Sequence, residues 1–190
     1  MTSTKLSLPT IDEVYDAQKH LKEYLVYLPV LKLNSNDQSV IEIYLKCEQF
    51  QPISSFKLRP AINAVKNLPN ALKQNGIVTA SAGNMAQGLS WIARKEKLLC
   101  QILVPDTANQ VKLDAIERLG GQTTKCTFEQ WWNVIISHQC PMLNGYFIHP
   151  VCDRNIIAGN GTIALEILEQ LPDCDVILGR FRVFSSLVDF

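Results

Sequence analysis

The sequence predicts an α/β protein built on a parallel sheet, and two observations support this fold class. After Gly76, short runs rich in β-forming residues alternate with stretches that show helical periodicity. Turn-forming residues separate these runs, as at Pro105-Asp106 and Gly120-Gly121. Strands and helices that alternate at this spacing form βαβ units, in which neighbouring strands are parallel. The chain has 190 residues, of which 47% are hydrophobic, so it is long enough to bury a core.

The N-terminal third predicts two helices and one strand. Thr10 and Glu13 have the spacing of a capping box, and apolar residues follow them at helical intervals. Ser55 offers an N-cap for a later helix, because its hydroxyl can accept a hydrogen bond from a free backbone N–H. The polar stretch 33–38 is typical of a loop. The predicted elements of this part are a helix at about 10–25, a strand at 41–46 and a helix from about residue 56.

The alternation after Gly76 continues to residue 178. Each strand is a short apolar or β-branched run, and each helix is an amphipathic stretch that ends near glycine, proline or a polar cluster. The predicted strands are 77–80, 100–104, 122–126, 146–148 and 175–178. The predicted helices are 83–97, 110–119, 128–137 and 163–171.

The composition excludes several classes of protein. Basic and acidic residues both number 18, so no basic face for nucleic acid is expected. No window holds the roughly 18 consecutive apolar residues of a membrane span, and the N-terminus lacks the apolar core of a secretory signal. The six cysteines form no C-x-x-C pair or zinc-finger pattern. We therefore expect a cytoplasmic protein with reduced thiols, no metal site, and neither nucleic acid nor membrane as partner.

Lys57 is the first candidate for chemistry, because it stands at the predicted start of a helix in Ser54-Ser55-Phe56-Lys57. The positive end of a helix favours the neutral form of an amine there. A neutral lysine amine can attack an aldehyde and hold it as a Schiff base. Taken alone, the residue is better explained as a solvated lysine.

The turn Thr79-Ala80-Ser81-Ala82-Gly83-Asn84 is the second candidate, because it joins a predicted strand to a predicted helix. Backbone N–H groups and the helix dipole converge at such a turn, which suits a carboxylate or phosphate. Gly83 permits close approach of a ligand to the backbone, and Ser81 and Asn84 add neutral donors. An ordinary capping loop would have a similar composition.

The third candidate is Gly159-Asn160-Gly161 before an apolar stretch, which fits a loose G-x-G-x-x-A dinucleotide fingerprint. That interpretation requires a strand that ends at the first glycine, and the run before Gly159 is a poor strand. A nucleotide-binding oxidoreductase is therefore the weaker hypothesis. The histidines add little: His138 is expected to cap a helix, and His149 either lines a cleft or is a satisfied structural residue.

Together and in order, these motifs resemble the fold-type-II pyridoxal-phosphate enzymes, specifically the threonine/serine dehydratase and serine racemase family. One of the matching motifs is Ser55-Phe56-Lys57-Leu58-Arg59. The similarity runs from about residue 8 to residue 178. The other segments that carry it are 44–52, 79–88, 104–112, 146–150 and 157–166.

The resemblance implies a tryptophan synthase β-subunit-like fold, with residues 77–148 as a small α/β domain and residues 1–76 and 149–190 as part of a large domain. It implies pyridoxal phosphate as cofactor, held covalently by Lys57 as the catalytic residue. Asn84 would hydrogen-bond the phenolic oxygen of the cofactor, and Ser81 and Gly83 would hold the substrate carboxylate. The implied reaction is β-elimination from L-serine or L-threonine to a 2-oxo acid and ammonia.

Two departures from the family pattern refine this expectation. Racemases of the family have a serine at the position of Ala82, and alanine cannot carry a proton, so the sequence favours a dehydratase. Pro60 stands where glycine is usual and removes one backbone donor from the predicted helix.

The end of the sequence departs most. Family members continue past a strand like 175–178 into a glycine-rich loop that holds the phosphate. Here residues 179–190 resemble no part of the family, so we expect a C-terminally truncated chain with weakened cofactor binding and low activity. The alternative is a non-catalytic relative that acts by association with full-length subunits. Under either hypothesis, the chain could also form homo-oligomers.

Overall fold

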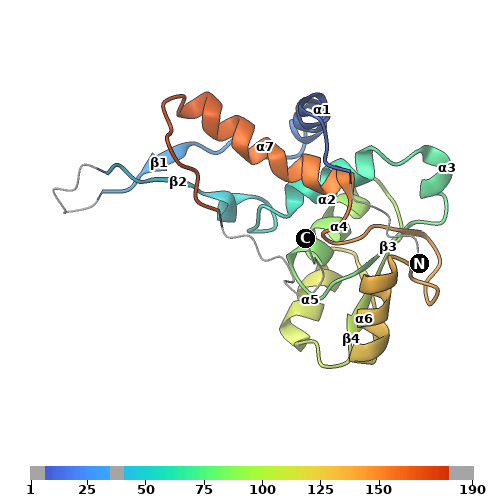
Figure 1. Ribbon diagram of the computed structural model, residues 1–190. Coiled ribbons are helices and arrows are strands. Elements are labelled where there is room, and N and C mark those ends of the chain that lie inside the picture. The colour runs from blue at the N-terminus through green and yellow to red at the C-terminus, as the bar shows by residue number, and fades with distance from the viewer. Residues whose placement is uncertain (1–6, 35–40, 180–190) are drawn as a thin grey trace.

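The computed structural model describes residues 7–34 and 41–179, which form an α/β fold (Figure 1). Residues 35–38 of the predicted loop and residues 180–190 of the out-of-family tail lie outside the described residues. The helices are α1 (Ile11–Leu21), the 3₁₀ helix η1 (Glu48–Phe50), α2 (Leu58–Lys66), α3 (Asn70–Lys73), α4 (Asn84–Lys95), α5 (Gln110–Arg118), α6 (Phe128–Ser137) and α7 (Arg154–Gln170). The strands are β1 (Val30–Lys32), β2 (Tyr44–Lys46), β3 (Ile77–Ala80), β4 (Cys100–Pro105), β5 (Gln122–Cys126) and β6 (Tyr146–Phe147).

Four parallel strands form the main sheet, in the order β5-β4-β3-β6. In the centre, Ile77 of β3 lies opposite Cys100 of β4 on one side and Tyr146 of β6 on the other. Gln101 of β4 lies opposite Gln122 of β5. Because all of these pairs are parallel, the predicted α/β class with a parallel sheet is confirmed.

Helices cover both faces of this sheet. Successive side chains of a strand point to opposite faces, so the neighbours Ile102 and Leu103 of β4 join different clusters. Ile102 packs into the main core together with Ile116 of α5 and residues of α4. Leu103 packs with Val134 of α6 on the other face. The alternation of βαβ units thus produces a three-layer arrangement, in which β3 ends at the turn that carries Ser81 and Gly83.

Helix α2 packs between α4 and α7, and its residues 58–65 are all buried. Glycines allow this close packing on both sides. A Cβ atom at Gly88 of α4 would lie 2.9 Å from the carbonyl oxygen of Lys57, and one at Gly159 of α7 would lie 2.6 Å from Cα of Pro60. Pro60 is the third residue of α2, where a backbone N–H would have no partner within the helix, so its missing donor costs little.

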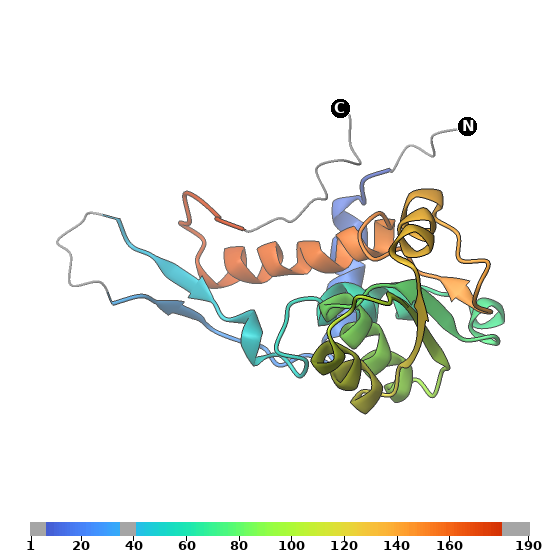
Figure 2. The ribbon, with the colours of Figure 1, turned by 90° about the horizontal axis from the view of Figure 1, so that it is seen from below.

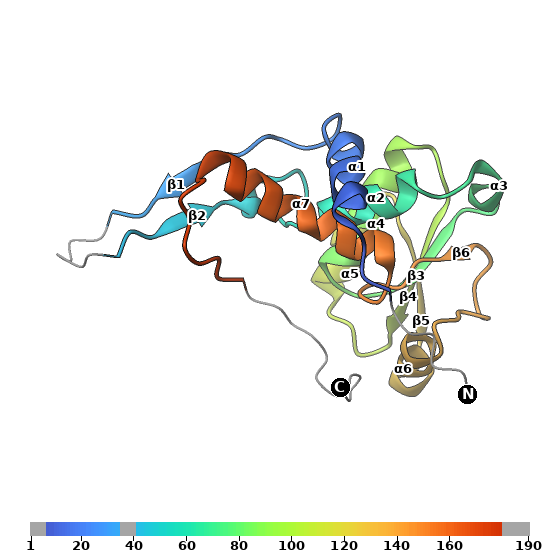
Figure 3. The ribbon, with the colours of Figure 1, turned by 45° about the horizontal axis from the view of Figure 1, so that its top comes forward.

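A two-stranded antiparallel ribbon, β1–β2, projects away from the main sheet, and α7 runs alongside it (Figure 2). Val30 lies opposite Lys46 in this ribbon. Gln170 at the end of α7 connects helix and ribbon, because its side chain accepts from Val30 N–H at 2.6 Å and donates to the Leu28 carbonyl at 3.2 Å. At its other end α7 packs against α1 (Figure 3). Helix α7 therefore contacts the ribbon at its C-terminal end and α1 near its N-terminal end.

The structure corrects several expectations. Helix α7 begins at Arg154 rather than at 163, because the Asp153 carboxylate caps it by accepting from two backbone N–H groups. Gly159 and Gly161 thus lie inside a helix with no strand directly before them, and the dinucleotide hypothesis is wrong. Residues 175–178 form no strand, since no described strand pairs with them. β1 and α3 were not predicted. The division into 77–148 and two flanking parts stays a prediction.

Candidate active site

Lys57 stands at the start of a helix, as the sequence predicted, but it is the N-cap residue of α2, and the predicted N-cap Ser55 lies before the helix. Its backbone N–H donates to the Ser55 hydroxyl at 3.2 Å, and Ser54 before it adopts a left-handed conformation with φ of 54° that turns the chain into the helix. The side chain is half-buried, and its Nζ lies 5.3 Å from the centre of the Phe56 ring. Burial lowers the pKa of the Lys57 amine, because removal from water disfavours the ammonium form. The site therefore favours a more nucleophilic amine.

The start of α4 forms the second part of the site. Gly83 is its N-cap in an extended conformation, and the Gly83 N–H donates to the Ser81 hydroxyl at 3.3 Å. No side chain caps this helix, so the first N–H groups of α4 are left for water or a ligand. A Cβ atom at Gly83 would meet nothing within 4 Å. Open space therefore lies directly beside the helix N-terminus.

Ser55 joins the two parts. Its buried hydroxyl accepts from the Lys57 backbone and from the side-chain amide of Asn84 at 3.1 Å. The predicted residues Lys57 and Asn84 thus share one hydrogen-bond partner, although 27 positions separate them. Ser55 was predicted only as a cap, and its position two residues before the lysine gave no sign of its contact with Asn84.

The two helix N-termini at this place have no side-chain cap, a feature that they share with the short helices α3 and η1. Helices α1, α5, α6 and α7 each have a side-chain cap, from Thr10, Asn109, Thr127 and Asp153 respectively. Helices α2 and α4, which begin at the candidate site, have none. The uncapped N-terminus of α4 offers free donors and the positive end of the helix dipole. At α2 the first N–H groups bond to Ser55 and Phe56, so this helix contributes its dipole but no free donor. The site thus combines a half-buried amine with groups that suit an anion.

A buried network of ion pairs surrounds Arg59, two residues after Lys57, and the sequence analysis did not predict it. The Arg59 side chain is fully buried and pairs with Glu48 of η1 and Glu166 of α7, and Lys46 of β2 also pairs with Glu166. Burial opposes ionisation of Glu166, but hydrogen bonds from Arg59 and Lys46 lower its pKa overall. A charged residue inside a strongly apolar helix start was the only signal that sequence offered for it.

The structure also brings His138, His149 and Cys152 together, with one ligand-type atom of each within 4.8 Å of the others. Both ring nitrogens of His149 are engaged: Nδ1 accepts from the N–H groups of Val151 and Cys152, and Nε2 lies 3.2 Å from the Ile135 carbonyl. No nitrogen of His149 is left to bind a metal. The residue is therefore structural, and His138 caps α6 in a left-handed conformation, as expected.

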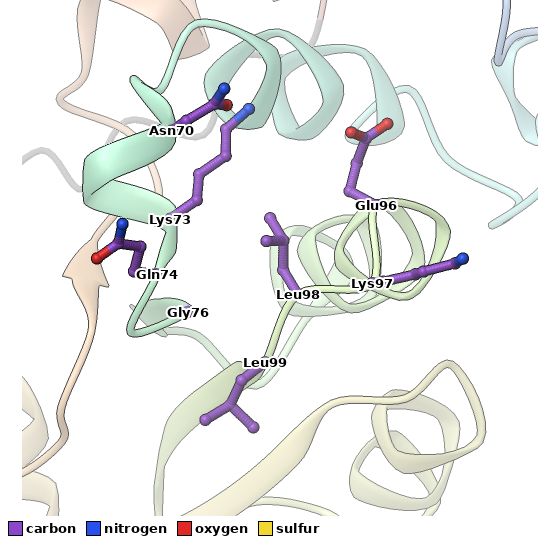
Figure 4. A pocket seen from close by; sticks show the side chains of 8 residues that line it. All are labelled: Asn70, Lys73, Gln74, Gly76, Glu96, Lys97, Leu98 and Leu99. Carbon is purple, nitrogen blue, oxygen red and sulfur yellow. The ribbon is translucent and has the colours of Figure 1, made fainter.

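A surface pocket of about 400 Å³ lies elsewhere (Figure 4). Its lining includes Lys73, Glu96 and Gly76, and Gly76 directly precedes β3. This is the opposite end of β3 from Gly83, and ligands of open parallel sheets bind at the carboxyl ends of the strands. The residues around Lys57 and Gly83, rather than this pocket, form the candidate active site.

Comparison with known proteins identifies the family of this chain. A family model described as pyridoxal-phosphate dependent enzyme matches residues 23–181. The chain is 36% identical to serine racemase of Dictyostelium discoideum over 176 residues, which is 89% of this chain and 53% of that protein. It is 35% identical to L-threonine ammonia-lyase of Thermotoga maritima over 173 residues, covering 89% and 43% of the two chains.

Similarity to solved structures extends over the same region. The structure of maize serine racemase superposes with a TM-score of 0.80 at 30% identity, over 89% of this chain and 52% of that one. The chain spans about half the length of the curated relatives it matches. Within residues 7–34 and 41–179, no helix has the length and apolar character needed to cross a membrane.

Proposed function

Because this chain belongs to the family of pyridoxal-phosphate-dependent enzymes, we propose that it carries the catalytic lysine of an amino-acid ammonia-lyase that acts on L-serine or L-threonine. The observation that supports this most is the pairing of Lys57 and Asn84 through Ser55, beside an uncapped helix N-terminus. The reaction would be a β-elimination that yields a 2-oxo acid and ammonia.

The described residues fit the aldehyde end of pyridoxal phosphate. The Lys57 amine would hold this aldehyde covalently, and the burial that lowers its pKa increases the fraction that is neutral and reactive. The Asn84 amide, which already donates to Ser55 across the site, would donate to the phenolic oxygen of the cofactor. When bound, the cofactor supplies an electron sink for the carbanion chemistry at the substrate α-carbon.

The substrate carboxylate would bind at the start of α4. The free N–H groups after Gly83 and the Ser81 hydroxyl are donors of the kind that a carboxylate accepts. The open space beside Gly83 leaves room for it. Once released as a free amine, Lys57 would accept the α-proton, which is a general-base role suited to an amine of lowered pKa.

Elimination rather than racemisation is proposed because of Ala82. Its methyl group packs against the main core cluster and offers no group that could deliver a proton to the second face of the substrate. The relatives include both racemases and lyases, so family membership alone does not decide between them. Chiral chromatography after incubation with L-serine tests the assignment, and D-serine formed faster than pyruvate would contradict it.

The covalent role of Lys57 is tested by reduction with borohydride in the presence of pyridoxal phosphate, followed by peptide mapping. Label is expected on Lys57 and lost in Lys57→Ala. Lys66→Ala is the matched control, because Lys66 lies on the same helix but is paired with Glu96. Label that stays in Lys57→Ala, or is lost only in Lys66→Ala, would contradict the proposal.

The non-catalytic alternative remains a prediction. It is supported by the apolar side chains that the ribbon exposes, such as Leu31, Ile43 and Leu45, each between 44% and 49% exposed. A titration with pyridoxal phosphate separates the two hypotheses. Absorption of a protein-bound Schiff base supports the enzyme, and its absence at saturating cofactor supports the association role.

A further inference from the structure

Arg59 lies two residues after Lys57, and the inference about it rests on the proposed function of that lysine. Its guanidinium is fully buried and contacts carboxylates on two sides. On one side, Nε and Nη2 each donate to the Glu48 carboxylate at 2.8 Å, which is a bidentate pair. Glu48 belongs to η1, which directly follows the ribbon. The first turn of α2 is therefore anchored to the segment that precedes it.

The other side of the guanidinium reaches α7. Nη1 and Nη2 donate to the two oxygens of Glu166 at 2.7 and 2.8 Å, and Nη1 also donates to the Thr162 hydroxyl at 3.1 Å. Lys46 supplies a second cation to Glu166 at 2.7 Å. Two cations and two carboxylates thus balance, which is the condition under which charges can be buried.

The position of Arg59 gives this network a role beyond charge balance. The first turn of α2 has no side-chain cap, and its first N–H groups bond only to Ser55 and Phe56 of the turn directly before it. These local bonds do not fix the position of the turn relative to other elements. Gly88 and Gly159 let α4 and α7 press on this turn, but small residues allow contact without directing it. Arg59 is the side chain of this turn that is bound through directional contacts to two other elements. A buried pair is a weak source of stability but can fix geometry.

We propose that Arg59 is a positioning residue, which holds the Lys57 amine in its half-buried place by tying the first turn of α2 to η1 and α7. The Arg59 guanidinium is occupied by Glu48, Thr162 and Glu166 and takes no part in proton transfer in this proposal. Its effect on the site passes through the backbone of the turn and reaches only the orientation and solvation of Lys57.

The test uses Arg59→Lys in the full chain without cofactor. This variant keeps the charge but loses the planar fork, which a lysine cannot replace at a bidentate site. Competitive acetylation across pH, with quantification of the Lys57 peptide by mass spectrometry, gives the titration midpoint of that amine independently of its accessibility. A looser turn would expose the amine to water and move the midpoint upward, toward the ordinary lysine value of about 10.4. A rise of half a unit already lowers the reactive fraction at pH 8 about threefold.

Lys46→Met is the matched control. Lys46 belongs to the same buried network and contacts Glu166, but it does not lie on α2. We expect Lys46→Met to lower the melting temperature and to leave the Lys57 midpoint unchanged. If Arg59→Lys fails to fold, Glu48→Gln replaces it, because it weakens one of the two pairs and should shift the midpoint in the same direction.

A Lys57 midpoint that does not move in Arg59→Lys, or that moves equally in Lys46→Met, would overturn the proposal and leave Arg59 as a structural residue only. The outcome is separable from that of the proposed function. Borohydride labelling of Lys57 with no effect of Arg59→Lys contradicts the positioning role alone. A shifted midpoint without any labelling by pyridoxal phosphate contradicts the proposed function alone.

Discussion

Gly159→Ala should destabilise the protein, although alanine normally stabilises a helix interior relative to glycine. The added Cβ would lie 2.6 Å from Cα of Pro60 and 3.0 Å from the Arg59 carbonyl oxygen, so it would press on backbone atoms that cannot rotate away. Relief requires α7 and α2 to move apart. Overpacking of this kind costs about 1–3 kcal/mol, and helix propensity returns about 1 kcal/mol. We expect a net loss of about 1–2 kcal/mol, since the clash is with backbone.

Gly161→Ala is the matched control, two residues further along the same helix. Its Cβ would lie 3.0 and 3.2 Å from the two methyl groups of Val14, which can adjust because they end a side chain. In Gly161→Ala, the gain in helix propensity and the cost of overpacking should therefore nearly cancel. Urea denaturation of both variants measures the difference, which corresponds to a melting temperature about 2–8 °C lower for Gly159→Ala at this chain length. The close approach of α2 and α7 is refuted if Gly159→Ala is as stable as Gly161→Ala or more stable.

Three further predictions concern the site and its surroundings. Gly83→Ala should change the free energy of unfolding by less than about 1 kcal/mol, because its methyl group meets no atom. The same methyl group would fill the space for the substrate carboxylate, so the KM for L-serine of the cofactor-loaded protein should rise about tenfold. An unchanged KM would place the carboxylate elsewhere. Ser55→Ala should lower the free energy of unfolding, measured by urea denaturation, by about 1–3 kcal/mol, because the Lys57 N–H and the Asn84 amide lose their shared acceptor. A loss below about 0.5 kcal/mol would show that water replaces the Ser55 hydroxyl. Burial and the nearby His138 charge lower the pKa of His149 to about 4, below the value of about 6.5 expected in the unfolded chain. Between these values the unfolded chain binds more protons, so stability should rise with pH from about 4 to 6.5, by about 3 kcal/mol at most, and His149→Gln should flatten this slope.

The sheet could be predicted well from the sequence because its signals are local. Strands β3 and β5 and helix α6 have the bounds that the sequence predicted, since glycine or polar residues flank each run and its side-chain pattern is consistent. Strand β1 was missed because it has only three residues. It becomes a strand by pairing with β2, and this partner lies 14 positions away.

The glycines inside α7 show what local sequence patterns cannot reveal. Gly159 and Gly161 suggest a turn when only neighbours in sequence are considered. In the structure both lie inside a helix, and a glycine is needed at 159 because Pro60, about 100 positions away in sequence, packs against it. In the candidate site too, some features follow from local sequence and others depend on contacts between distant residues. Lys57, Ser81, Gly83 and Asn84 could be named from the sequence motifs, whereas the contact through Ser55 depends on how α2 packs against α4.

The 107 positions between Arg59 and Glu166 also set a sequence of events during synthesis. At about 5–20 residues per second, a ribosome needs about 5–20 s to proceed from one to the other. During this interval the guanidinium has Glu48 as its partner but not Glu166. Once residue 105 has been made, β3, α4 and β4 are complete and can pair locally while Glu166 is still missing. The turn that carries the lysine therefore reaches its final geometry after the sheet beside it. In pulsed hydrogen exchange on nascent chains, we expect the amides at the start of α2 to gain protection later than those of β3 and β4.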